Sequence, residues 1–234
     1  MTDGYGISKN NQGNRPGEFF RQLSQEALFE LEGLQHIFAH PAGSILFAER
    51  QTPQGILIVL EGEVKLSMNS SEGKRLILRI ARAGDVLGLT ATISGTTHGT
   101  TAEAIHPCKV AMVRRDAFLS FLLRHPEAYQ SVAREVVAHY DKACEQLRTV
   151  GLGSSAPTRL ARLILGWSEN AKQTPDGSRL KISFTHEEIS EFIGTTRETV
   201  TRTLQHLRNE HLVELHGSTW MIPNRVALEN YAGM

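Results

Sequence analysis

One segment of this chain, residues 184–208, limits the possible folds more than any other part of the sequence. It reads FTHEEISEFIGTTRETVTRTLQHLR. Thr185 followed three residues later by Glu188 has the spacing of a capping box, which marks the first turn of a helix. Gly194 stands where the chain must turn sharply, because glycine adopts a positive φ without strain. The segment therefore predicts two short helices joined by a tight turn.

The outer face of the second predicted helix is charged. The helix opens with Thr-Thr-Arg-Glu, so that Thr195 or Thr196 is the expected N-cap, and Arg202 follows one turn after Glu198. Arginine presents two donors to a guanine edge, and glutamate accepts from a cytosine amino group. This face predicts a helix that enters a DNA major groove N-terminus first and reads a G·C-rich half-site. An ordinary solvated helix face is the alternative.

The sequence on either side of the helix pair fits a small DNA-binding domain. Residues 158–170 have the spacing of a helix, 172–178 read as a polar turn, and 212–224 predict a hairpin or wing. Upstream, the residues GLGSSAP at 151–157 would break a helix and are predicted to form a hinge. A wing directly after the two helices favours the DNA-binding interpretation.

Short apolar runs dominate the chain from about Ala39 to Arg115. They are SILFAE, GILIVLEG, EVKLSM, RLILRIA and CKVAMVR, and turns rich in Gly, Pro, Asn and Ser separate them. Short strands at such regular intervals predict an antiparallel sandwich or roll. Before them, residues 18–36 space their large apolar side chains mainly by three and four, which predicts a short helix.

A long helix is predicted after Pro126. Its apolar residues recur in alternating steps of four and three, from Tyr129 to the end of the helix. That period is typical of a coiled-coil seam, whereas a core helix that happens to keep the period is the alternative. We expect two copies of the chain to pair through a seam formed by Val136, Tyr140, Ala143, Leu147 and Val150.

The overall composition limits the function classes. The formal net charge is zero, which argues against a protein coated in positive charge for nonspecific nucleic-acid binding. No apolar run approaches the length of a membrane span, and residues 1–17 contain no secretory signal and are predicted to be disordered. Cys108 and Cys144 form neither a metal-binding spacing nor a disulfide framework, so we expect a cytoplasmic protein without a membrane partner.

Residues 184–217, FTHEEISEFIGTTRETVTRTLQHLRNEHLVELHG, closely resemble the winged helix-turn-helix of the CRP/FNR family of bacterial transcription regulators. LEGEVKL and ARAGDVLG resemble two signatures of that family's cyclic-nucleotide-binding β-roll. The resemblance implies an α+β fold, with an N-terminal cyclic-nucleotide-binding-type β-roll, a long dimerisation helix and a C-terminal winged helix-turn-helix. The corresponding ranges are 18–124, 125–150 and 157–234, with a hinge at 151–156.

The resemblance also implies roles for single residues in DNA binding. Arg197, Glu198 and Arg202 fall on the three base-reading positions of the CRP branch, and Arg197 favours a TGTGA-like half-site. His186 stands where that branch has an arginine, which predicts a weaker or pH-sensitive phosphate grip. The positions that match phosphate contacts are Thr185, Thr196 and Thr199, and Thr201 shares the outer face with them.

The expected effector pocket departs from the family pattern. Leu89 occupies the position of the ribose-binding glutamate, and the phosphate-binding arginine aligns with His98 or Gly99. A Thr-Ser pair of the long helix is replaced by Ala143-Cys144. Without the arginine a charge-assisted contact is lost, so cAMP is not expected to bind in the usual way. The pocket positions taken from the resemblance are Gly88, Leu89, His98, Gly99, Thr100, Thr101, Ala143 and Cys144.

The residue types present limit the other sensing chemistries. An iron–sulfur centre is excluded because no cysteine precedes Cys108, and no metal site is predicted. Haem remains an alternative through His98, His106 and Cys108, although isolated histidines are more often ordinary surface or hydrogen-bonded residues. The segment 95–101, GTTHGTT, reads either as a loop or as an anion cradle.

The sequence thus predicts a homodimeric, sequence-specific transcription regulator rather than an enzyme. Its expected partners are double-stranded DNA, a second copy of the chain and RNA polymerase. A cupin-like metalloenzyme fused to a DNA-binding domain is the competing class, but the roll offers no close His-x-His pair.

Overall fold

The computed structural model of the protein describes residues 17–151 and 155–234. Contacts divide the chain into two compact units, with residues up to 68 and 78–143 in the first and 69–77 and 144–234 in the second. The division falls inside the long helix rather than at the predicted hinge, most of which lies outside the described residues. The predicted tail lies outside them too, except for Gly17. Within the described ranges, no helix is both long and apolar enough to cross a bilayer.

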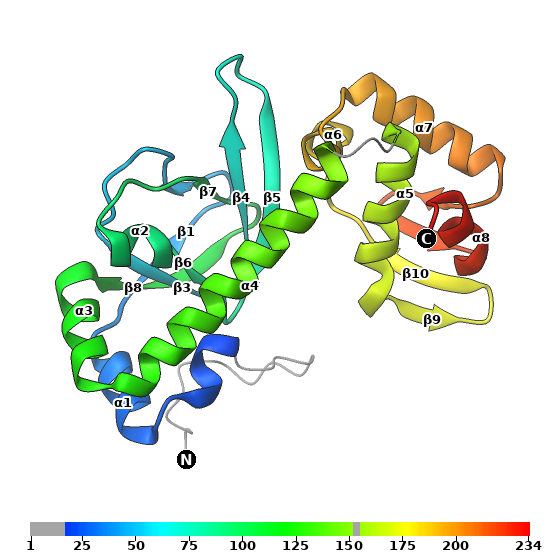
Figure 1. The fold of residues 1–234 in the computed structure, drawn as a ribbon. Coiled ribbons are helices and arrows are strands. Elements are labelled where there is room, and N and C mark those ends of the chain that lie inside the picture. Colours follow the sequence, from blue (N-terminus) through cyan, green and yellow to red (C-terminus); the bar gives the residue numbers. More distant parts are fainter. Residues whose placement is uncertain (1–16, 152–154) are drawn as a thin grey trace. The chain divides into compact units, whose positions relative to one another are not determined.

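The first unit is built on two antiparallel four-stranded sheets (Figure 1). One sheet has the order β1-β8-β3-β6 and the other the order β2-β7-β4-β5. The strands of the first sheet are β1 (His36–His40), β8 (Cys108–Arg114), β3 (Gly55–Glu61) and β6 (Val86–Leu87). Those of the second are β2 (Ile45–Phe47), β7 (Thr101–Ala104), β4 (Glu63–Asn69) and β5 (Arg75–Arg82). The predicted roll is therefore present.

Strand β3 has a continuous apolar sequence rather than an alternating one, because both of its faces are buried. Ile58 joins a buried cluster shared with the helices, and the next residue, Val59, joins the cluster between the two sheets. Because successive side chains point to opposite faces, a strand covered on both faces needs apolar residues throughout.

The helices of the first unit differ from the sequence prediction near the N-terminus. Instead of one helix over 18–36, a 3-10 turn η1 (Glu18–Gln22) precedes α1 (Gln25–Gly33), and β1 already begins at His36. The reason is local, since Leu23 is extended and the Ser24 hydroxyl accepts from the Ala27 N–H to cap α1. Two further helices, α2 (Leu89–Ser94) and α3 (Arg115–Arg124), were not predicted.

The long helix α4 (Pro126–Gly151) presents different faces to different surroundings. Ala128 and Val132 are buried against the roll and its covering helices. Two seam residues, Tyr140 and Leu147, are 68% and 65% exposed. Of the other three, Val136 is half-buried against the same core cluster, and Ala143 and Val150 are half-buried.

The second unit combines helices with a four-stranded sheet of order β11-β12-β10-β9. Its helical elements are α5 (Ala156–Trp167), η2 (Ser168–Asn170), α6 (His186–Ile193), α7 (Arg197–Asn209) and α8 (Arg225–Tyr231). Its strands are β9 (Lys172–Thr174), β10 (Gly177–Lys181), β11 (Glu214–His216) and β12 (Thr219–Ile222). The predicted wing is the β11-β12 hairpin, whereas α8 was not predicted.

Residues 172–178 are not the predicted polar turn. They lie in the β9-β10 hairpin, because β10 pairs with β12 and thereby continues the sheet of the wing. Only alternate positions of β10, such as Ser178 and Leu180, are buried, so the strand carries many polar residues. This polar composition is the reason why the sequence predicted a turn. α5 also ends at Trp167, short of the predicted residue 170.

An aromatic cluster joins the elements of the second unit. The Trp167 ring stacks on Phe184 with centroids 5.2 Å apart and meets Phe192 edge-on at 5.6 Å. Trp220 of the wing packs against Trp167 at 6.5 Å. Such pairs add to the free energy of burying the rings. The cluster packs α6 against α5 and the wing. It thereby holds the helix pair α6 and α7 on the rest of the second unit.

An ion-pair network ties α1 to the junction of α3 and α4. Glu30 accepts from Arg124 and lies 2.8 Å from Nε2 of His125 through its other oxygen. These contacts, with the Arg124 hydrogen bond first, lower the pKa of the Glu30 carboxyl to about 2. The carboxylate is therefore favoured in the folded protein over the unfolded chain.

We expect Glu30→Gln to destabilise the first unit at neutral pH and the difference from the unchanged protein to shrink as the pH falls from about 5 towards 2. Because the folded pKa is depressed, its stabilisation is present above the unfolded value of 4.5 and is lost as pH falls through the folded value. Urea unfolding followed by circular dichroism at pH 7, 5 and 3 measures the difference in the free energy of unfolding between the two proteins. Glu26→Gln, on the same helix, is the control, and equal effects of both variants at every pH would contradict the network.

Candidate nucleic-acid interface and ligand pocket

The two helices α6 and α7 are connected through caps that the sequence predicted. At the start of α6, the Thr185 hydroxyl accepts from the Glu188 N–H at 3.2 Å, and the Glu188 carboxylate accepts from the Thr185 N–H at 3.0 Å. Gly194 ends α6 with a φ of 61°. Of the two candidate N-caps of α7 the structure selects Thr196, whose hydroxyl accepts from the Thr199 N–H. The predicted helix–turn–helix is confirmed.

Arg159 of α5 fastens the turn from outside. Its Nε donates to the carbonyl of Ile193 at 2.7 Å, and Nη2 donates to the carbonyl of Gly194 at 3.3 Å. These carbonyls belong to the end of α6, where backbone acceptors lack intrahelical partners and cations are favourable. Sequence reasoning missed this residue, because nothing in a sequence pairs an arginine with a carbonyl 34 positions away.

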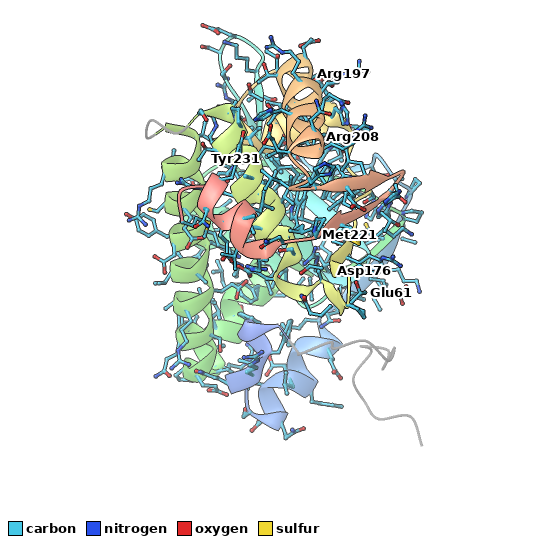
Figure 2. The ribbon with its side chains drawn as sticks, turned by 90° about the vertical axis from the view of Figure 1, so that its right-hand side faces the viewer. Glu61, Asp176, Arg197, Arg208, Met221 and Tyr231 are labelled. Atoms are coloured by element: carbon cyan, nitrogen blue, oxygen red, sulfur yellow. The ribbon has the colours of Figure 1, made fainter. Side chains whose placement is uncertain are left out.

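The charged face of α7 is free of protein cover. Arg197, Glu198 and Arg202 are exposed, as is Thr201, whereas Val200, Leu204 and Leu207 are buried. Figure 2 shows Arg197 and Arg208 at different levels along α7. The expected base-reading residues thus lie together on the N-terminal half of one exposed helix face, the half that enters a groove in helix-turn-helix proteins.

Two hydrogen bonds position side chains on this face. Thr201 donates to the carbonyl of Arg197 at 3.0 Å, so its oxygen accepts from Nδ1 of His186 at 2.8 Å. Arg202 Nη2 donates to the Thr199 hydroxyl at 3.4 Å. His186 therefore reaches across from α6 to α7, a contact that the resemblance alone did not indicate.

Glu198 is held in its charged form. The backbone N–H of Glu198 and then the Thr196 hydroxyl hold the pKa of the carboxyl below its usual value, with smaller contributions from the charges of Arg197 and Arg202. An ionised carboxylate only accepts hydrogen bonds. The face thus presents one acceptor group between two arginines that only donate.

The first unit contains a pocket of about 400 Å³ between the roll and α4. Six of the predicted pocket positions line it: Gly88, Leu89, His98, Gly99, Thr100 and Ala143. Thr101 and Cys144 are not among the lining residues, and their place in an effector site stays a prediction. Thr101 begins β7 and its hydroxyl accepts from the Glu49 N–H, while Cys144 follows Ala143 at a different angle around α4.

Three basic residues line the pocket that sequence reasoning did not assign to it. They are Arg79 on β5, and His139 and Lys142 on α4. A signal was present, because Arg79 is the one charge inside the apolar run RLILRIA after its first residue, and His139 lies four positions before Ala143 and three before Lys142. Residues three or four positions apart share a helix face.

His98 is the only one of the three candidate haem ligands that lines the pocket, since His106 and Cys108 do not. Its ring stacks on Phe47 with centroids 3.9 Å apart, and burial lowers the pKa of the imidazole. No group of three or more His, Cys, Asp or Glu side chains suited to a metal ion occurs in the described ranges. Haem binding therefore stays an untested prediction.

The β-roll with its pocket, the long helix and the winged helix-turn-helix together define a class of DNA-binding transcription regulators. Residues 38–125 match the cyclic nucleotide-binding domain, and residues 158–231 match the Crp-like helix-turn-helix domain. The chain belongs to the CRP/FNR family, as its sequence resemblance predicted.

A curated relative supports the assignment along most of the chain. The protein is 25% identical over 190 residues to the cAMP-activated global transcriptional regulator CRP of Pasteurella multocida, with 80% of this chain and 90% of that protein covered. The same description and 25% identity apply to the relative from Salmonella typhimurium, with 80% and 89% covered.

Two solved structures have the same fold. FixK2 from Bradyrhizobium japonicum gives a TM-score of 0.73 at 22% identity, covering 84% of this chain and 96% of that one. The c-di-GMP responsive global regulator CLP from Xanthomonas campestris gives 0.75 at 16% identity, covering 86% and 100%. At these identities the likeness shows the fold alone.

We expect Thr196→Ala to lower the free energy of unfolding of the second unit by about 1 kcal/mol, because the Thr199 N–H loses its cap. Both tryptophans, Trp167 and Trp220, lie in this unit, so their fluorescence in urea reports on it. Thr195→Ala is the matched control, since no hydrogen bond of its hydroxyl to a described residue is seen. Equal destabilisation by the two changes would rule out Thr196 as the functioning cap.

Proposed function

We propose that the protein is a homodimeric regulator that recognises a TGTGA-like palindrome and is not switched by cAMP in the usual way. The exposed set of Arg197, Glu198 and Arg202 at the N-terminal end of α7 is the observation on which the DNA specificity rests. Two arginines and one carboxylate match the guanine edges and the cytosine amino group of such a half-site. Thr185, Thr196 and Thr199 are the proposed phosphate contacts, and His186 contributes through Thr201.

The proposed dimer is supported by the exposed apolar stripe of α4. Tyr140 and Leu147 are solvent-exposed in the single chain, and Val137 next to the seam is 58% exposed. An apolar stripe at heptad spacing on an exposed helix face is the surface by which two helices pair. A twofold dimer would present two recognition helices to one face of the duplex, so the operator should be a palindrome.

The proposed independence from cAMP is supported by the pocket. Leu89, at the expected ribose position, is an apolar side chain only 2% exposed. His98 and Gly99 line the pocket where the phosphate-binding arginine is expected, and Ala143 offers no hydroxyl. A ribose and a cyclic phosphate placed there would each lose a charged or hydroxyl partner.

The remaining parts of the proposal rest on the family rather than on geometry. The protein acts by binding DNA in the cytoplasm and contacts RNA polymerase at its promoters. Activation or repression then depends on where the operator lies relative to the polymerase.

Arg202→Ala should weaken binding to a TGTGA palindrome by roughly 1–3 kcal/mol and relax specificity at one base pair, because the lost contact is a base contact. Fluorescence anisotropy with the palindrome and its single-base variants, at one fixed salt concentration, measures both quantities. Arg208→Ala, towards the other end of α7, is the control and should have a much smaller effect. Adding cAMP should leave the affinity of the unchanged protein as it was. An Arg202→Ala variant with full affinity and specificity would refute the placement of Arg202 in the major groove.

Leu147→Glu should convert the dimer to single chains, because it places a charge in the proposed apolar seam. Light scattering on the eluate of a sizing column would show the mass falling from two chains to one. Leu123→Glu, on α3 and 76% exposed, changes a leucine that is even more exposed than Leu147 and should leave the mass at two chains. If the Leu147→Glu variant stayed dimeric, the dimer interface would lie elsewhere than in the proposed seam.

A further inference from the structure

The pocket of the first unit has a one-sided charge. Among its described lining residues the charged or titratable side chains are Arg79, Lys142, His98 and His139, and no aspartate or glutamate is present. The rest of the wall is largely apolar, with Phe47, Leu66 and Leu87 among its members. A cavity of this kind suits a ligand with an apolar body and a negative group.

Carboxylates that do not line the pocket hold its cationic wall in place. Arg79 Nη1 pairs with the Asp85 carboxylate at 3.1 Å, and Nη2 lies 2.9 Å from Nε2 of His139. Glu135, beneath His139, approaches the same nitrogen at 3.1 Å. Burial raises the pKa of Glu135, but the His139 contact and the nearby cations outweigh it and the pKa is lowered. Arg79 is thereby fixed before any ligand arrives, which reduces the entropy lost on binding.

Lys142 adds a second cation to the pocket wall. It lies one turn beyond His139 on the pocket side of α4, and the carboxylate on which its charge acts, that of Glu135, does not line the pocket. Since no acidic residue lines the pocket, this ammonium and the Arg79 guanidinium together attract an anion.

His98 supplies a second kind of contact. The residue is only 5% exposed, yet no hydrogen bond from its ring nitrogens to a described residue is seen. Burial lowers the pKa of the ring, which favours the neutral imidazole, and a neutral imidazole offers one donor and one acceptor. Neither ring nitrogen is among the described buried polar atoms that lack a partner, so both remain accessible from the pocket and a ligand there can hydrogen-bond to them.

We propose that this pocket binds a small organic anion with an apolar, sugar-free body. The anionic group lies at Arg79 and Lys142, the apolar body lies against Phe47, Leu66 and Leu87, and His98 forms a hydrogen bond to it. The absence of a carboxylate for ribose hydroxyls separates this ligand from a cyclic nucleotide. The inference deepens the proposed function by naming the class of effector, but the binding site itself does not depend on DNA binding.

The test uses two fluorescent probes with the same body. 1-Anilinonaphthalene-8-sulfonate carries the anion, and N-phenyl-1-naphthylamine lacks it. We expect saturable binding of the sulfonate to the full-length protein, at least roughly tenfold tighter than binding of the neutral probe, because a charge-assisted contact is added. Lys142→Met and Arg79→Met should each weaken sulfonate binding roughly tenfold and leave the neutral probe little changed.

The control is Arg82→Met, on the same strand as Arg79, whose side chain pairs with Glu63 outside the pocket. Lys142 is exposed and no ion pair between its ammonium group and a described residue is seen, so its variant tests the proposal even if the Arg79 variant does not fold. Equal affinity for the two probes, no saturable binding, or sulfonate binding that is insensitive to Lys142→Met would overturn the proposal. Displacement of the sulfonate by micromolar cAMP would also overturn it. A protein that binds the sulfonate as expected but no palindrome would refute the proposed function and leave the pocket standing.

Discussion

The packing of α4 is the constraint on which the first unit depends. A single helix has to fill the core with Ala128 and Val132, close the pocket with His139 and Lys142, and leave Tyr140 exposed. These demands are compatible because residues three and four apart share a face, so different faces of one helix meet different surroundings. The pocket wall and part of the proposed seam, Val136, Tyr140 and Ala143, are therefore parts of the same helix within the first unit.

This arrangement gives a physical route for regulation. A ligand held by Lys142 and a second chain held by Tyr140 would act on neighbouring turns of α4. Binding changes the behaviour of the protein only if the ligand prefers one of two arrangements of that helix. In the proposed arrangement the two events would be coupled through α4 itself, without a chain of intermediate residues.

The proposed DNA-reading face of α7 is held in place by other contacts. Its two helices begin with side-chain caps, the turn between them is held by Arg159, and the Trp167 cluster fixes α6 on its support. Each contact satisfies a backbone group or buries an aromatic ring. Exposed arginines on such a support keep a defined spacing, which base-specific contacts require.

Local patterns in the sequence determined the roll, the long helix, the helix-turn-helix with its caps and the wing, because each depends on spacings within a few residues. The same reasoning failed at residues 18–36 and 172–178, where a cap at Ser24 and pairing of β10 with the wing outweighed the local pattern. The tertiary structure alone decided that Arg79 meets His139, 60 positions away, and that Arg159 closes the turn after α6. Side chains distant in sequence come together only through the fold, so the order of residues marks Arg79 and His139 singly but does not show that they line one pocket.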